Sequence, residues 1–173
     1  MNKGKLYLAA DHAGFEYKNI LHKYFEDVGL DHYEVIDLGA FVYNESDDYP
    51  DIIARAGLLV SANPTRDKAI IFGGSGQGEA IVANKFAGVR AVVYYGYNHE
   101  IIALSREHND ANVLSIGARF VNDKEMVEAA NQWLGTPFSD EKRHKRRIDR
   151  ITTIEKNRAW RFLERILNRT PNK

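Results

Sequence analysis

The sequence predicts an α/β fold, a three-layer α/β/α arrangement around a five-stranded parallel Rossmann-like sheet, with a helical extension at the C-terminus. Short apolar runs bounded by turn residues alternate with longer segments of helical period. This alternation is typical of a parallel sheet covered by helices on both faces. The 173 residues, 44% of them hydrophobic, are enough for one domain with a substantial core.

Five runs rich in β-branched and aliphatic residues predict the strands. They lie at residues 6–10, 33–38, 68–72, 89–95 and 112–117. The crossovers between parallel strands should be right-handed, whereas the order of the strands does not follow from the pattern.

Segments with apolar residues at helical spacing separate these strands. Their apolar faces start at Phe15, Ile52, Ile101 and Met126, and a further helix is expected at residues 79–85.

The connection at residues 39–49, GAFVYNESDDY, is long, polar and aromatic. It ends at Pro50, a residue suited to the first turn of a helix. Loops of this length in compact domains are often functional.

The composition excludes several classes of protein. Without cysteine there are no disulfides, thiolate metal sites or cysteine nucleophiles. The apolar run before Asp11 is too short for a signal-peptide core, and no run reaches the roughly eighteen apolar residues of a membrane helix. We therefore expect a cytoplasmic protein without membrane contact.

The net charge of zero hides an asymmetry. Residues 142–169 carry eleven Lys or Arg and three acidic residues, so this segment is basic. The rest of the chain carries thirteen Lys or Arg and twenty-one acidic residues, so it is acidic. A basic end on an acidic body suits a nucleic acid, a small anion or the body of a second subunit, and it also fits a solvated helix face.

The stretch IIFGGSGQGEAIVANK, residues 70–85, is the strongest candidate site. Four glycines and one serine fill the loop at residues 73–78, between a predicted strand and a predicted helix. Glycines let backbone N–H groups face a ligand at close range, and the N–H groups at the start of a helix favour an anion. We therefore expect the loop to hold a group that is, or becomes, negative.

Three familiar motifs each miss this loop by one place. A P-loop needs lysine where Glu79 follows Gly78, and the dinucleotide pattern needs a third glycine where Glu79 stands. The nucleophile elbow needs glycine where Gln77 stands. A glycine-rich turn without chemistry is the remaining structural alternative.

Glu79 stands where the loop ends. An acid in the first turn of a helix is often only a favourable partner of the helix dipole. Over an anion-binding loop, it also suits a general base that deprotonates a carbon acid, with the loop N–H groups stabilising the enolate oxygen.

Further polar clusters are candidates for substrate contacts. Asp11 and His12 follow the first strand, although Asp11 also suits the N-cap of the next helix. His108 and Asn109 lie in the connection before the fifth strand, where a histidine suits acid–base work near neutral pH. The six histidines show no metal-ligand spacing, so no metal is expected.

Arg143 and Arg147 lie four residues apart, so two guanidinium groups on one helical face could share an anion. Taken alone, this segment equally suits a solvated basic helix or an RNA contact.

Seven stretches occur together in a fixed order: AADHAGFEYK, VIDLGA, DDYPD, GGSGQGEAIVANKFAGVRAV, REHNDANVLSIGAR, WLGTPF and RHKRRID. In this combination the chain resembles the type B ribose-5-phosphate isomerase family, which also includes galactose-6-phosphate and allose-6-phosphate isomerases. The similarity extends from about residue 5 to residue 150.

The resemblance implies interconversion of ribose 5-phosphate and ribulose 5-phosphate in the pentose phosphate pathway, through an enediolate and without a cofactor or metal. Many family members use a cysteine as the base at the position of Gly73. A second branch uses a glutamate at the end of the loop, and this chain resembles that branch through Glu79.

The resemblance also implies the other site residues. Glu79, His108 and Ser75 correspond to catalytic positions, with His108 opening the furanose ring. The substrate contacts correspond to Asp11, His12, Tyr49, Gly74, Gly76, Gln77, Gly78, Asn109, Arg119, Arg143 and Arg147, with the arginines on the phosphate side.

Family members are dimers or tetramers whose sites draw on two subunits. We therefore expect an isomerase domain at residues 1–150 and a helical tail at 151–173 that packs on a neighbouring subunit. The apolar stripe of that tail comprises Trp160, Leu163, Ile166 and Leu167.

Three alternatives are weighed against the pentose phosphate reaction. One is isomerisation of a hexose 6-phosphate, such as allose or galactose 6-phosphate, in a pocket whose depth Tyr49 limits. The second is a catalytically silent module that binds a sugar phosphate or nucleotide. The third is RNA binding by the basic tail, which we do not favour.

Overall fold

The structure, a computed structural model, describes residues 3–167, with side chains described as far as residue 157. The chain divides into two compact units, Met1–Phe138 and Ser139–Lys173.

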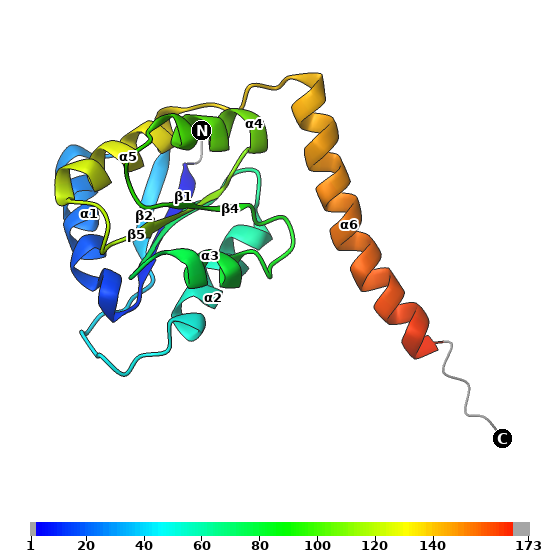
Figure 1. The fold of residues 1–173 in the computed structure, drawn as a ribbon, viewed down its shortest axis with the longest axis horizontal. Coiled ribbons are helices and arrows are strands. Elements are labelled where there is room, and N and C mark those ends of the chain that lie inside the picture. Colours follow the sequence, from blue (N-terminus) through cyan, green and yellow to red (C-terminus); the bar gives the residue numbers. More distant parts are fainter. Residues whose placement is uncertain (1–2, 168–173) are drawn as a thin grey trace. The chain divides into compact units, whose positions relative to one another are not determined.

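Within its described residues, the first unit contains a five-stranded sheet in which all pairings are parallel (Figure 1). The strands are β1 (Gly4–Ala10), β2 (Tyr33–Asp37), β3 (Lys68–Gly73), β4 (Ala91–Tyr94) and β5 (Val113–Gly117). All five predicted strands are confirmed, although β4 is shorter than its apolar run. Their spatial order is β2-β1-β3-β5-β4.

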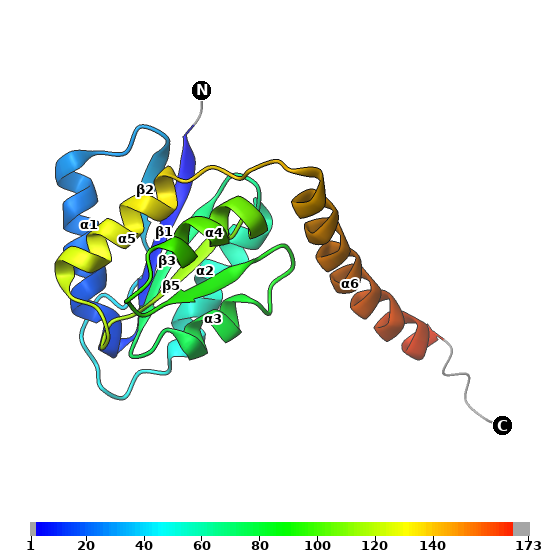
Figure 2. The same cartoon turned by 45° about the horizontal axis from the view of Figure 1, so that its top comes forward.

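Helices cover both faces of this sheet (Figure 2). One face carries α1 (Phe15–Val28), α4 (Glu100–Asn109) and α5 (Asp123–Gly135), and the other carries α2 (Tyr49–Ala62) and α3 (Gln77–Ala83). The three-layer α/β/α prediction is therefore confirmed.

Two apolar clusters hold the layers together. Leu21, Ile102 and Trp133 belong to the cluster under α1, α4 and α5, whereas Ile53 and Ala83 belong to the one under α2 and α3. The central strand β3 and its neighbour β5 are buried along their whole length, as expected for parallel strands covered on both faces.

The register of the strands brings three loops to the same edge. Ala10 pairs with Phe72, and Gly73 pairs with Gly117. Because the strands are parallel, the segments that follow β1, β3 and β5 all leave from the carboxyl edge of the sheet. The short 3-10 helix η1 (His12–Gly14) follows β1 there.

The second unit contains α6 (Lys142–Leu167). This helix continues across residue 150, and the division into compact units falls after Phe138. The domain boundary at residue 150 stays a prediction. Residues 168–173 and the side chains of the predicted stripe, Trp160, Leu163, Ile166 and Leu167, lie outside what the structure describes. Among the described helices, none combines the length and apolarity needed to cross a membrane.

Candidate active site

The glycine loop connects β3 directly to α3, which begins at Gln77, two residues earlier than predicted. Gly76 precedes the helix with a φ of +75°, a conformation that glycine adopts without strain. The continuation of β5 anchors the loop: Ser115 Oγ donates to the carbonyl of Gly76 (2.7 Å), and the Ala118 N–H donates to that of Gly73 (2.9 Å).

The loop packs too closely for side chains at several positions. A Cβ on Gly78 would lie 2.8 Å from the phenolic oxygen of Tyr49, and a Cβ on Gly74 would lie 3.2 Å from the Arg119 guanidinium carbon. Tyr49 and Arg119 therefore lie against the glycine loop. Ser75 is exposed, and its hydroxyl accepts from the Gln77 N–H at 3.3 Å.

Glu79 is buried, with 4% of its surface exposed. Its carboxylate fills the space in which a side chain at position 73 would lie, since a Cβ on Gly73 would overlap it. Burial raises the pKa of Glu79, and the Asp11 carboxylate adds to this rise, while its own backbone amide opposes it. A carboxylate with a raised pKa is a stronger base, suited to taking a proton from carbon near neutral pH.

Asp11 caps η1, as the simpler reading of the sequence predicted: its Oδ1 accepts from the Gly14 N–H at 3.0 Å. It is also buried near Glu79, and burial raises the pKa of Asp11. The capping role therefore coexists with a place in the site.

Asp47 is a residue of the site that the sequence analysis missed. Its Oδ1 lies 2.6 Å from Nδ1 of His12, and this hydrogen bond raises the pKa of His12. The Oδ2 atom is buried without a hydrogen-bond partner among the described residues. The signal was the paired acids of DDYPD, which end the long loop before α2.

This bond fixes the orientation of the imidazole. With Nδ1–H donated to Asp47, Nε2 of His12 carries a proton for an anionic ligand in the imidazolium form, which the raised pKa of His12 favours. Arg119 lies close enough to His12 to lower its pKa, against the larger effect of Asp47. His12 and Arg119 thus form a positive region beside the glycine loop.

Asp11, His12 and Asp47 are also the described residues whose donor atoms could hold a metal ion, since these atoms lie within 4.8 Å of one another. However, His12 Nδ1 and Asp47 Oδ1 already bind each other, and Asp11 Oδ1 accepts from Gly14. The arrangement therefore orients a histidine well without an ion.

His108 and Asn109 lie away from these residues. The sequence analysis placed them in a loop, whereas the structure places them in the last turn of α4, before the start of β5. Glu79 lies against Gly73, which pairs with the last residue of β5. The length of β5 alone separates the two edges by about 13 Å.

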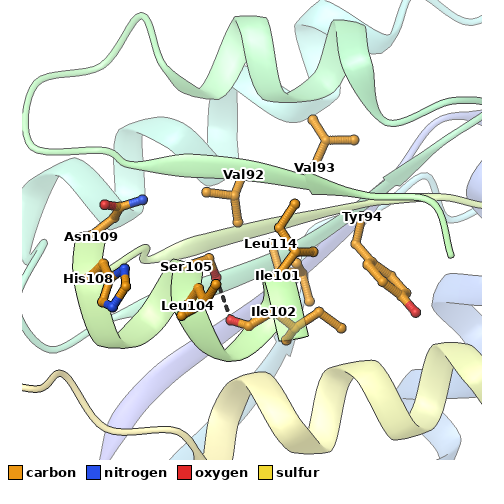
Figure 3. Close-up of a pocket in the computed structure, with 10 residues that line it drawn as sticks. All are labelled: Val92, Val93, Tyr94, Ile101, Ile102, Leu104, Ser105, His108, Asn109 and Leu114. Carbon is orange, nitrogen blue, oxygen red and sulfur yellow. Dashed lines mark hydrogen bonds between the residues drawn. The ribbon is translucent and has the colours of Figure 1, made fainter. Parts of the chain in front are cut away.

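His108 and Asn109 line a separate cavity of about 360 Å³ between α4 and β4 (Figure 3). Its other lining residues are mostly apolar, among them Val92, Ile101 and Leu114. One chain therefore brings together Asp11, His12, Tyr49, the glycine loop, Glu79 and Arg119, but not His108 and Asn109.

Arg143 and Arg147 lie on α6 in the second unit, and both are exposed. The guanidinium of Arg143 pairs with the Glu141 carboxylate at 2.7 Å. Arg147 lies one helical turn further on, as the spacing predicted.

A parallel α/β sheet with a glycine loop, a buried carboxylate and a cationic region at its carboxyl edge suits an enzyme that removes a proton from a small anionic substrate. The family model for ribose/galactose isomerases matches residues 6–151. The chain belongs to this family, so the predicted family is confirmed.

Curated relatives and solved structures agree with this assignment. Ribose-5-phosphate isomerase B of Escherichia coli is 37% identical over 155 residues, covering 89% of this chain and 98% of that protein. The enzyme of the same name from Mycobacterium tuberculosis is 37% identical, covering 90% and 93%. The Mycoplasma genitalium enzyme, solved with bound ribulose-5-phosphate, superposes with a TM-score of 0.82 at 34% identity, covering 88% of this chain and 96% of that one.

Proposed function

We propose that this chain interconverts ribose 5-phosphate and ribulose 5-phosphate, a step of the pentose phosphate pathway, with Glu79 as the base. The observation that carries the proposal is the buried Glu79 carboxylate, held against Gly73 above the glycine loop. A solved relative with 34% identity has ribulose-5-phosphate bound.

The reaction is a proton transfer between neighbouring carbons. Glu79 removes the proton from C2 of the open-chain aldose, the C–H electrons form a C1–C2 double bond, and the aldehyde oxygen becomes an enediolate oxygen. The same carboxyl group returns the proton to C1 while the proton of the C2 hydroxyl passes to the negatively charged O1, so that C2 becomes the ketone and C1 a hydroxymethyl group. Backbone donors of the glycine loop stabilise the enediolate, an effect worth about 10²–10³-fold for a single oxyanion donor.

The phosphate lies on the cationic side of the site. His12, oriented by Asp47, and Arg119 bind it from one chain. Arg143 and Arg147 supply further positive charge, at the spacing at which two guanidinium groups share one anion.

Ribose 5-phosphate is mostly a closed furanose, so the ring has to open first. We assign this step to His108, with Asn109 beside it, in the site of a second copy of the chain. The supporting observation is their location at the amino edge, away from Glu79 of the same chain.

A homodimer with shared sites accounts for this arrangement. Exposed aromatic side chains lie near the carboxyl edge on the loops after β4 and β5: Tyr95, Tyr97 and Phe120. The basic segment at 142–169 and the acidic body have opposite charges. We propose that the body of one subunit receives α6 of the other, including the tail after residue 150.

The base is tested with Glu79→Gln, assayed with ribose 5-phosphate in excess chelator. We expect a folded protein with at most about 10⁻³ of the wild-type kcat. A folded variant that retains most of the activity would remove Glu79 from the role of base. Activity of the wild type in the chelator would show that the reaction needs no exchangeable metal.

Shared sites are tested by mixing inactive variants. In a hybrid dimer of Glu79→Gln and His108→Ala subunits, one of the two sites contains both intact residues. A one-to-one mixture that exchanges subunits freely should regain about a quarter of the wild-type activity, since half the dimers are hybrids with one good site. No recovery, with exchange verified by mass spectrometry, would refute the shared site.

A hexose 6-phosphate is the second candidate substrate, because the matching family model covers both ribose and galactose isomerases. The close packing of Tyr49 on Gly78 favours the shorter pentose. Relative kcat/KM for ribose 5-phosphate, allose 6-phosphate and galactose 6-phosphate decides between them.

A further inference from the structure

The turn between α4 and β5 contains a cluster of charged residues that the proposed reaction does not use. Asp110 is its centre and has a φ of +45°. Its Oδ2 accepts from Nη2 of Arg90 at 2.8 Å, and its Oδ1 accepts from Nη1 of Arg106 at 2.8 Å. Two arginines, one on each side, therefore hold one carboxylate.

Both arginines also bind the backbone of the same turn. Nε of Arg90 donates to the carbonyls of Asn109 and Asp110, each at 2.9 Å. Nη1 of Arg106, a residue with only 5% of its surface exposed, also donates to the carbonyl of Ala111. Three consecutive carbonyls thus have guanidinium donors.

A third side chain locks Arg90 itself. Oδ1 of the buried Asn112 accepts from the backbone N–H of Arg90 at 2.8 Å. Nδ2 of Asn112 donates to the carbonyls of Pro64 (3.0 Å) and Gly88 (2.8 Å). The Arg106 guanidinium in turn lies 5.6 Å from the Trp133 ring centre in the core. The cluster is therefore tied to β4, β5 and α5 at once.

Ending a helix needs much less than this. In many helices a single residue in the left-handed conformation, usually glycine and sometimes asparagine, is enough to satisfy carbonyls of the last turn. Here the charged groups converge on the residues directly after His108. Catalytic groups have to be held to within roughly 0.5 Å, and side chains that lock the backbone beside them provide this.

We propose that Arg90, Asp110 and Arg106 are positioning residues that hold His108 and Asn109 in place for the site of the partner subunit. They act on the reaction only through the last turn of α4 and touch no substrate. The inference rests on the proposed role of His108 in ring opening.

The test separates ring opening from proton transfer. Isomerisation of ribose 5-phosphate needs both steps. Ribulose 5-phosphate, whose C5 oxygen is esterified, cannot close a furanose ring, so exchange of its C1 hydrogen with deuterated water needs proton transfer alone. A defect in His108 should therefore reduce isomerisation far more than exchange.

The variant is Asp110→Asn, because asparagine has the same shape and tolerates a positive φ, while the charge and one of the two oxygens that accept from the arginines are lost. We expect a tenfold loss of kcat/KM for ribose 5-phosphate and less than a twofold loss in C1 exchange. The matched control is Asp67→Asn, a buried aspartate at the same edge that accepts from Lys5 and Tyr7 and has no bond to the turn. It should change both rates by the same factor.

If Asp110→Asn does not fold, Arg90→Lys is measured in its place. Lysine keeps the positive charge but lacks the Nε–H group that donates to the carbonyls of Asn109 and Asp110. The same selective loss of isomerisation is expected. Equal losses in both rates for the folded variant would overturn the inference. His108→Ala is measured in parallel. If His108→Ala keeps full isomerisation, the ring-opening role of His108 is refuted, and the positioning role of Arg90, Asp110 and Arg106 with it. If His108→Ala loses isomerisation while Asp110→Asn does not, only the positioning role is refuted.

Discussion

Gly73→Ala tests the placement of the base without removing it. A methyl group at this position would overlap the Glu79 carboxylate, whereas the adjoining backbone continues β3. The carboxylate would have to move by more than about 1 Å to regain a normal contact of about 3.5 Å.

The expected loss follows from that displacement. A misplacement of about 1 Å in a catalytic group lowers the rate roughly 10²-fold, which corresponds to about 2.7 kcal/mol of transition-state stabilisation. Overpacking should also lower the free energy of unfolding by about 1–3 kcal/mol. The fall in activity should therefore persist at temperatures far below the unfolding midpoint.

The assay compares kcat/KM for ribose 5-phosphate and the thermal midpoint in Gly73→Ala and Gly135→Ala. Gly135 ends α5, and a Cβ there would meet no atom within 4 Å, so this control should keep wild-type activity. If folded Gly73→Ala matched the control in kcat/KM, the carboxylate would not act from the place described here.

Two further predictions concern titrating groups. Burial raises the pKa of Glu79, so the stability that its neutral form provides is lost as pH rises through that raised value. Glu79→Gln should therefore have a higher thermal unfolding midpoint than wild type at pH 8 and the same midpoint at pH 3. The gain in the free energy of unfolding at pH 8 should be about 1.4 kcal/mol for each unit of pKa shift. An equal difference between variant and wild type at both pH values would contradict this. Asp47 raises the pKa of His12. Asp47→Asn should therefore raise KM for ribose 5-phosphate about tenfold with little change in kcat. The increase in KM should be largest at pH values at which His12 is protonated in the wild type but not in the variant. Asp48→Asn is the neighbouring control, and an unchanged KM in Asp47→Asn would remove the bond to His12 from phosphate binding.

The strands and the glycine loop were predictable because each depends on local chemistry. An apolar run such as KAIIF forms a strand buried on both faces, and the glycines that follow it predict a connection without bulky side chains, which the structure places between the end of β3 at Gly73 and the start of α3 at Gln77. Glu79 was identified for the same reason, since an acid directly after such a loop faces whatever the loop binds.

The missed features depend on contacts across the fold. Asp47 meets His12 across 35 positions of sequence, and their bond exists only because the long loop returns to the end of β1. The contact of the Glu79 carboxylate with Gly73 likewise depends on the geometry of the turn.

The location of His108 explains why this family would need two chains for one reaction. In a parallel sheet, helices run opposite to the strands, so a residue in the last turn of α4 lies at the amino edge, whatever its sequence. Loops at the carboxyl edge can hold a base and a phosphate, but a group at the end of a crossover helix cannot reach them within its own chain. In the proposed homodimer, a two-fold axis brings one subunit's amino edge to the carboxyl edge of the other. In that dimer the fixed turn at Asp110 has a function that stability alone does not require, because its carboxylate lies beside a part of the chain that fits the second subunit.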